Sequence, residues 1–254
     1  MAVLRIDNLT KIFGGTRGIP TSNILKGISM NIAQGEFVGI MGPSGSGKTT
    51  LLNIISGIDT PTLGSVELFD SNISSMSKDS RAVFRRKNLG MIFQNYNLLE
   101  SLTIKENILL PMSIDKNNSK IIESRAELLM DFFMIRDIQN KFPYNVSGGQ
   151  QQRAAACRAL INDPPLILAD EPTGNLDSKS AQKFMKYMQS ITENRNKSIL
   201  MVTHDPYAAS FCQRIIFLQD GKLYSQLTRK GSQKEFFGNI LDSLALLGGT
   251  IYEV

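Results

Sequence analysis

A glycine-rich loop between an apolar strand and a helix is the feature that most constrains this chain. The segment GPSGSGKTT, residues 42–50, matches the pattern G-x-x-x-x-G-K-[ST] through Gly42, Gly47, Lys48 and Thr49. It follows the strand-like FVGIM and precedes the helix-like TTLLNIISG, which is the context in which such loops bind phosphate groups. Glycines let backbone N–H groups point at the phosphates, Lys48 brings a positive charge, and Thr49 offers a hydroxyl to Mg²⁺. The sequence therefore predicts a site for a nucleoside triphosphate and Mg²⁺.

Polar side chains follow three other apolar strands. LILADEP ends at Asp170 and Glu171, MVTHDP contains His204, the only histidine of the chain, and LGMIF is followed by Gln94. Because parallel strands end at one edge of a sheet, where open α/β folds bind ligands, we expect these groups beside the loop. Asp170 would serve the metal, and the Gln94 amide would reach the metal or the water. Glu171 would polarise the attacking water, and His204 would contact the γ-phosphate. The alternatives are a DEP segment that caps a turn and a histidine that is merely structural.

A second glycine pair lies in NVSGGQQQRAAACRAL, residues 145–160. The SGGQ segment, residues 147–150, stands at the start of a predicted helix, and a helix N-terminus is again suited to phosphate. A complete phosphate loop already lies about a hundred residues earlier. The chain therefore carries two phosphate half-sites.

Strand-like and helical stretches alternate along the chain, which is typical of an α/β fold with a mostly parallel core sheet. The strands stop between residues 95 and 160, where apolar residues recur at helical spacing at Ile122, Ala126, Leu129 and Phe133. We expect a single domain over 1–254 with a helical lobe inserted at 95–160. The predicted strands lie in EFVGIMG, SVELFD, LGMIFQ, PLILADEP, SILMVTHD and RIIFLQDGKLYSQ.

Composition narrows the partners and the compartment. The 28 Lys and Arg are scattered among 23 Asp and Glu, so the net charge of +5 does not by itself indicate nucleic-acid binding. No apolar run approaches the roughly 18 residues that cross a bilayer, and the start lacks a signal-peptide core. Cys157 and Cys212 have no metal-binding spacing and suit a reducing cytoplasm. We expect a protein that serves a membrane only through a partner.

Taken in order, the motifs resemble the ATP-binding subunit of ABC transporters across nearly the whole chain. GPSGSGKTT, Gln94, SGGQ, LADEP, NLD at 175–177 and TH at 203–204 carry this resemblance. It implies a P-loop NTPase fold, with an antiparallel β subdomain and the helical lobe, that hydrolyses ATP with Mg²⁺. The whole loop is expected to bind the nucleotide, through Gly42, Pro43, Ser44, Gly45, Ser46, Gly47, Lys48, Thr49 and Thr50.

The resemblance also accounts for the two phosphate half-sites, because such subunits form head-to-tail homodimers. The SGGQ segment of one subunit would then bind the γ-phosphate of the ATP held by the other. Asp177 would cross the interface, and Phe13 in KIFGG would stack on adenine, where family members commonly carry Tyr. A core position is the alternative for Phe13. The residues of the SGGQ segment are Ser147, Gly148, Gly149 and Gln150.

Residues 93–114 are similar to the segment that, in related exporters, forms a groove for a cytoplasmic coupling helix of the membrane permease. Together with residues 203–227 and 232–249, they resemble the Bce-type ATPases of the macrolide-exporter and lipoprotein-release superfamily. That group is associated with resistance to bacitracin and other antimicrobial peptides, and with sensor histidine kinases. The resemblance thus implies a peripheral subunit on the cytoplasmic face of the plasma membrane.

Two other classes of ABC protein would carry the same nucleotide-binding motifs and are alternatives to a transporter subunit. An ABC ATPase that acts on a permease-like partner in cell division or signalling would carry all of them, and only the groove and the tail argue against it. A translation or DNA-repair ABC protein usually has two ATPase units or a long coiled-coil insertion, and this chain has neither.

The last segment, 230–254, is predicted to be a helical tail that packs on its own domain, with a partner-binding helix as the alternative. Segment 14–27 is rich in turn formers and is expected to make a hairpin loop near the adenine. Gly248 and Gly249 are expected to stop the tail helix. Its apolar stripe is expected at Phe237, Ile240, Leu241, Leu244 and Leu247.

Overall fold

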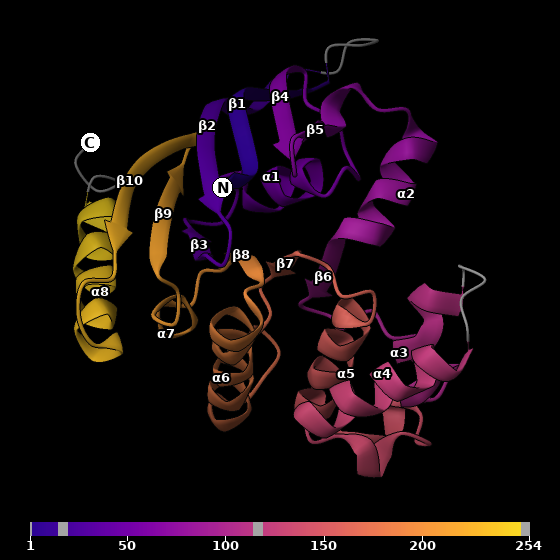
Figure 1. The fold of residues 1–254 in the computed structure, drawn as a ribbon. Helices are drawn as coiled ribbons and strands as arrows, with labels where there is room; N and C mark the ends of the chain where they lie inside the picture. The colour runs from indigo at the N-terminus through magenta and orange to yellow at the C-terminus, as the bar shows by residue number, and fades with distance from the viewer. Residues whose placement is uncertain (1, 15–19, 114–118, 250–254) are drawn as a thin grey trace.

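The computed structural model describes residues 2–14, 20–113 and 119–249, and these residues form two sheets with helices packed around them (Figure 1). The larger sheet has the strand order β10-β9-β3-β8-β7-β6. Neighbouring strands from β9 to β6 are parallel, and β10 closes the edge as an antiparallel hairpin with β9. The strands are β3 (Phe37–Met41), β6 (Leu89–Phe93), β7 (Leu166–Asp170), β8 (Ser198–Val202), β9 (Arg214–Gln219) and β10 (Lys222–Thr228).

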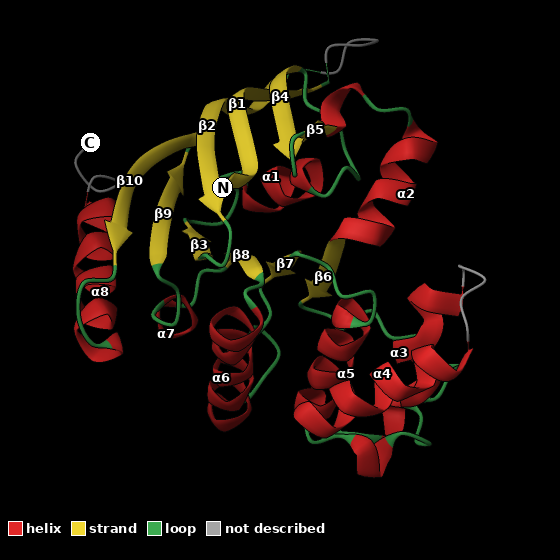
Figure 2. Ribbon diagram, viewed as in Figure 1, coloured by secondary structure: helices red, strands yellow, loops and turns green. Residues whose placement is uncertain are grey.

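The smaller sheet is antiparallel, with the order β2-β1-β4-β5 (Figure 2). Its first two strands are not among those predicted from the sequence. In β1 the alternation of inward and outward side chains is broken, because Asn8 has a φ of 44° and the pairing register shifts between Ile6 and Leu9. An antiparallel subdomain therefore lies beside a mostly parallel core sheet, as predicted. Its strands are β1 (Ala2–Phe13), β2 (Ser22–Ala33), β4 (Leu63–Leu68) and β5 (Ser71–Asn72).

Helix α1 (Lys48–Ile55) lies between the two sheets (Figure 1). Its buried residues Leu51, Leu52, Ile54 and Ile55 join an apolar core with side chains of both sheets. The burial of four side chains anchors the helix whose first residue is Lys48, so the phosphate-loop lysine is held by the core. Two elements follow β5 and lead to β6, namely η1 (Ile73–Ser75) and α2 (Lys78–Asn88).

A helical lobe lies beside the β6 edge of the larger sheet (Figure 1). Ile122, Ala126, Leu129 and Phe133, the residues at helical spacing, are all buried in the core that includes its helices. The lobe contains α3 (Ile104–Ser113), α4 (Ser119–Phe132), η2 (Arg136–Ile138), η3 (Pro143–Asn145) and α5 (Gly148–Leu160).

The tail forms helix α8 (Gln233–Gly249), which packs near α7 (Pro206–Ala209). Its buried side chains are Phe236 and Ile240, so the predicted stripe is one residue out of register at its start. Phe237 is instead partly exposed, with its ring against Tyr207 at 6.4 Å. A capping pair between Ser232 and Glu235 fixes where the helix begins.

Helix α6 (Ser178–Arg195) lies between β7 and β8 in the chain. The strands β1 and β2 pair up to Phe13 and Ser22, and the tip of the predicted hairpin loop at 15–19 lies outside the described residues, as does the side chain of Leu247. Among the described residues, no helix combines the length and the apolar character that a membrane span needs.

We predict that Asn107 is a main anchor of the lobe. Its buried side chain accepts from the Leu99 N–H at 2.7 Å and donates to the carbonyls of Leu99, Leu102 and Thr103. Asn107→Ala would leave these groups unpaired and lower the free energy of unfolding by about 2–3 kcal/mol. Urea denaturation measures the loss. Asn239→Ala, at an exposed position of α8, is the control, and equal stability of the two variants would contradict the prediction.

Candidate nucleotide-binding site

The glycine-rich loop connects β3 to α1 through a tight backbone path. A Cβ at Gly42 would lie 2.0 Å from the backbone oxygen of Leu218, so a side chain cannot fit there. Gly45 and Gly47 have φ values of 80° and 103°, which favour glycine. These glycines are required by the path of the loop.

Lys48, the first residue of α1, is folded back on its own loop. Its ammonium donates to the carbonyl oxygens of Gly42 at 2.8 Å and Pro43 at 2.9 Å. Burial lowers the pKa of Lys48, while the charges of Glu171 and Asp170 act in the opposite direction. A phosphate at this point would supply the negative charge that a half-buried ammonium favours.

A cavity of about 340 Å³ borders the loop, and Glu171 is one of the residues that line it. Beside it, the Ser46 hydroxyl is buried and has no hydrogen-bond partner among the described residues. A buried polar group of this kind calls for a ligand or a water, because leaving it unpaired costs free energy. The loop thus fits a phosphate-bearing ligand. The cavity is lined by Ile24, Ser44, Gly45, Gly47, Lys48, Thr49, Thr50 and Glu171.

Asp170 and Glu171 stand at the end of β7, where the sheet register places them beside the ends of β6 and β8. Asp170 pairs with Phe93 on one side and Val202 on the other. Burial raises the pKa of Asp170, the neighbouring Glu171 raises it further, and Lys48 lowers it. A bound divalent cation would favour the ionised carboxylate and reverse this shift.

Glu171 and His204 form a close pair. His204 Nδ1 lies 2.8 Å from Glu171 Oε1, and the His204 backbone N–H donates to Oε2 at 3.2 Å. The side chain of Glu171 is 15% exposed and that of His204 is 69% exposed, so the carboxylate lies inward and the imidazole lies at the rim. Glu171 has a φ of 45°, and its N–H donates to the Val202 carbonyl at 2.9 Å. Both oxygens of the carboxylate are therefore fixed by one neighbour.

Gln94 follows β6, but its amide faces the turn at 174–175. A Cβ at Gly174 would lie 2.7 Å from Gln94 Nε2. The Asn175 amide donates to the Gln94 carbonyl at 3.1 Å and to Asn95 Oδ1 at 2.9 Å, and the Tyr96 hydroxyl donates to the Asn175 carbonyl at 3.2 Å. Sequence reasoning did not single out Asn175 or Tyr96 by itself. The positive φ values of Tyr96 and Asn97, which make this tight turn, leave no clear pattern in the sequence.

The SGGQ segment starts helix α5 and does not line the cavity beside the phosphate loop. Ser147 and Gln150 form a capping box: the Gln150 N–H donates to the Ser147 hydroxyl at 3.3 Å, and the Ser147 N–H donates to Gln150 Oε1 at 2.9 Å. Added Cβ atoms at Gly148 and Gly149 would lie 2.7 Å from the Tyr96 hydroxyl and 2.9 Å from the Ser180 hydroxyl. The chain therefore does not bring its two phosphate half-sites together.

Asp177 and Phe13 are both exposed. Asp177 caps α6 by accepting from the Ser180 N–H at 2.9 Å, and hydrogen bonds from Ser180 lower its pKa. The ring of Phe13 lies 4.7 Å from the ammonium of Lys11. The exposure of Phe13, at 44%, excludes the core position that was the alternative to stacking.

The sequence profile described as ABC transporter matches residues 25–174. The chain belongs to the ABC transporter family. It is 47% identical to the bacitracin export ATP-binding protein BceA of Halalkalibacterium halodurans over 251 residues, which are 98% of each chain. It is 42% identical to the macrolide export ATP-binding/permease protein MacB of Campylobacter jejuni over 86% of this chain and 34% of that protein.

A relative of known structure is a dimer. The ATP-binding cassette MJ0796 of Methanocaldococcus jannaschii, a dimer in a post-hydrolysis state bound to ADP and Pi, has a TM-score of 0.82 to this chain. The two are 38% identical, and the match covers 90% of this chain and all of MJ0796. The chain is accordingly an ABC ATPase that binds ATP and has the ABC cassette fold predicted from its motifs.

We predict that Gly148 is needed because Tyr96 occupies the space of a side chain. Gly148→Ala would place a methyl 2.7 Å from the Tyr96 hydroxyl and shift the start of α5, and we expect the ATPase rate to fall about tenfold or more. Tyr96→Phe in the same chain removes the contacting oxygen and should recover part of the loss in a phosphate-release assay.

Gly238→Ala is the control, because no atom lies within 4 Å of the added methyl. An unchanged rate for Gly148→Ala would contradict the prediction. Failure of Tyr96→Phe to recover any rate would show that the methyl obstructs something other than Tyr96.

Proposed function

We propose that this ABC ATPase is the ATP-hydrolysing subunit of a bacterial transporter that confers resistance to antimicrobial peptides of the bacitracin kind. The observation that carries the proposal is the 47% identity to BceA over 98% of both chains, which includes most of the tail beyond the family profile. A shared nucleotide site alone would not separate this function from others in the family. The match over nearly the whole length supports a shared partner as well.

The phosphate loop would hold the ATP phosphates through its backbone N–H groups, the Lys48 ammonium and the Ser46 hydroxyl. Mg²⁺, when bound, supplies positive charge to the phosphate oxygens. Thr49 and Asp170 would hold it, and Gln94 would join them after its amide turns away from Gly174 and Asn175. Because Mg²⁺ usually takes one or two carboxylates together with substrate phosphates and water, this small donor set suits it. Phe13 would offer its exposed ring to the adenine.

Glu171 is the base that this proposal assigns to hydrolysis. One of its carboxylate oxygens would accept a proton from the attacking water, since each oxygen keeps a lone pair beyond its contact with His204. His204 would keep the carboxylate oriented and present its exposed edge to the γ-phosphate. Lys48 would leave its two loop carbonyls for the phosphate oxygens.

A homodimer would complete the site. The SGGQ segment of one subunit, with its N-terminal N–H groups, would bind the γ-phosphate held by the phosphate loop of the other. Asp177, exposed at the start of α6, would lie at the interface. The dimeric state of MJ0796 supports this arrangement. Loss of the γ-phosphate would remove a contact between the subunits and let them separate.

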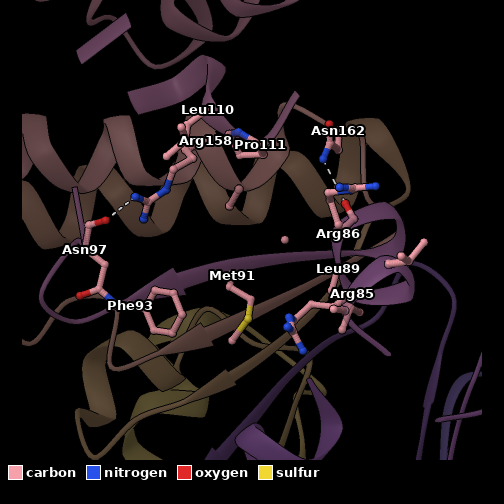
Figure 3. Close-up of a pocket in the computed structure, with 14 residues that line it drawn as sticks. Arg85, Arg86, Leu89, Met91, Phe93, Asn97, Leu110, Pro111, Arg158 and Asn162 are labelled. Carbon is pink, nitrogen blue, oxygen red and sulfur yellow. Dashed lines mark hydrogen bonds between the residues drawn. The ribbon is translucent and has the colours of Figure 1, made fainter. Parts of the chain in front are cut away.

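The membrane partner would be a permease that docks beside the lobe. Between α2, β6, α3 and α5 lies a cavity of about 550 Å³, open to the surface, which we call the lobe groove (Figure 3). MacB, a relative whose name joins an ATP-binding part and a permease, supports a permease partner. The chain would thus sit on the cytoplasmic face of the plasma membrane, and a sensor histidine kinase could join it through the permease.

We predict that Glu171→Gln binds ATP but does not hydrolyse it. The amide keeps the shape of the carboxylate but cannot take a proton from water, so the rate should fall about 100-fold or more. Size-exclusion chromatography with ATP should then show a trapped dimer. Thr203→Ser, at the buried residue that follows the neighbouring strand β8, is the control for packing. Rapid hydrolysis by Glu171→Gln would remove Glu171 from the role of base.

The test of the physiological role is a pull-down of tagged protein from detergent-solubilised native membranes, followed by mass spectrometry. Recovery of a permease with a large extracellular domain, and loss of bacitracin resistance when Glu171→Gln replaces the native chain, would support the proposal. Recovery of cell-division proteins instead, with resistance unchanged, would overturn the transport role and leave the ATPase chemistry intact.

A further inference from the structure

The lobe groove is lined mainly by apolar residues, and helix α2 forms one of its walls. Helix α2 has no buried side chain, and Val83 on it is 44% exposed. Most apolar residues of the groove come from α2, β6 and α3, and Ala159 comes from α5. Among them are Val83, Leu89, Met91, Phe93, Leu110 and Pro111.

All charged residues that line the groove are cations. They are Arg85 and Arg86 on α2 and Arg158 on α5, and no Asp or Glu is among the lining residues of the described chain. Arg85 donates to the backbone carbonyl of Ser56 at 3.4 Å. Arg158 donates to the carbonyl oxygens of Tyr96, at 2.7 Å, and Asn97. Within the part of the chain that the structure describes, neither Arg85 nor Arg158 forms an ion pair.

Arg158 is largely buried and lines the groove together with Leu110 and Pro111 (Figure 3). Burial lowers the pKa of its guanidinium, and no carboxylate opposes this effect. A positive charge that is withdrawn from water and bonded only to carbonyl oxygens favours an incoming anion. A guanidinium has five N–H donors, so Arg158 can keep its two carbonyl bonds and still bind a carboxylate.

Resting on the proposed function, we propose that the permease segment entering the lobe groove is an apolar helix that carries a carboxylate, and that Arg158 binds this carboxylate. Apolar side chains of the segment cover Met91, Phe93 and Leu110, and Arg85 adds positive potential from the facing wall. The chemistry of the groove thereby selects its partner: a neutral or basic segment would leave a buried cation unpaired or face repulsion.

Arg158 also connects the groove to the nucleotide site. It holds the turn at Tyr96 and Asn97, and the Tyr96 hydroxyl reaches both the carbonyl of Asn175 and the space above Gly148. A carboxylate on Arg158 therefore acts on the turn that carries Tyr96, whose hydroxyl donates to the Asn175 carbonyl. Docking would change ATP hydrolysis through these bonds.

The test uses fluorescent peptides that tile the cytoplasmic loops of the permease recovered with the chain, and fluorescence anisotropy with the full-length protein. One apolar peptide with an Asp or Glu should bind. Replacing its Asp by Asn, or its Glu by Gln, should weaken binding about tenfold or more. Arg158→Gln should weaken binding of the acidic peptide similarly, and the amide peptide should lose little further affinity on this variant, as a double-mutant cycle requires.

Lys87→Gln is the matched control, because Lys87 is an exposed cation of α2 that does not line the groove. Arg158→Lys, which keeps the charge, should retain part of the affinity. Arg85→Gln should also weaken binding of the acidic peptide, and it does so without removing a hydrogen bond to Tyr96. Equal binding of acidic and amide peptides would overturn the carboxylate proposal while the permease partner stands. Binding of no peptide would overturn docking at this groove and with it the inference.

Discussion

The register of four parallel strands is the constraint on which the nucleotide site depends. Ile40 of β3 and Asp170 of β7 both pair with Val202 of β8, and Asp170 pairs in turn with Phe93 of β6. The residues that follow each strand therefore begin at one level of the sheet. Backbone hydrogen bonds continue this order past the strand ends, from Glu171 to Val202 and from Thr203 to Ile40. A slip of one residue would move Asp170 relative to the ends of β6 and β8 and so separate the residues of the site.

This placement gathers opposite charges in partly dehydrated surroundings. Burial lowers the pKa of Lys48 and raises that of Asp170, and each charge counteracts the shift of the other. Neither charge is fully compensated, because burial remains the largest cause of each pKa shift. A phosphate and a divalent cation would supply the missing partners at the two ends of the same site. The protein is thus electrostatically suited to receive both together.

Sequence reasoning works best here where function depends on local backbone. The phosphate loop, the strand ends and the SGGQ helix start all use short patterns whose physical meaning is fixed by neighbours in the chain. The antiparallel strands β1 and β2 show the limit, because the irregular register at Asn8 breaks the alternation that would reveal β1. The tail shows another: Phe236 and Phe237 lie four and three residues before Ile240, so either fits an apolar stripe, and the sequence does not show that Phe236 is the one that packs inward.

The contacts of Tyr96 and Asn175 could not be foreseen for a different reason. They join segments about 80 residues apart through side-chain-to-backbone bonds, and no periodic pattern encodes such a pair. The start of α5 is ordered without any ligand, because Ser147 and Gln150 of the SGGQ segment already close a capping box there. In the proposed dimer, a phosphate would meet a preformed helix N-terminus, and little ordering free energy would oppose binding. In that dimer, the half-site of one chain would serve the ATP held by the other.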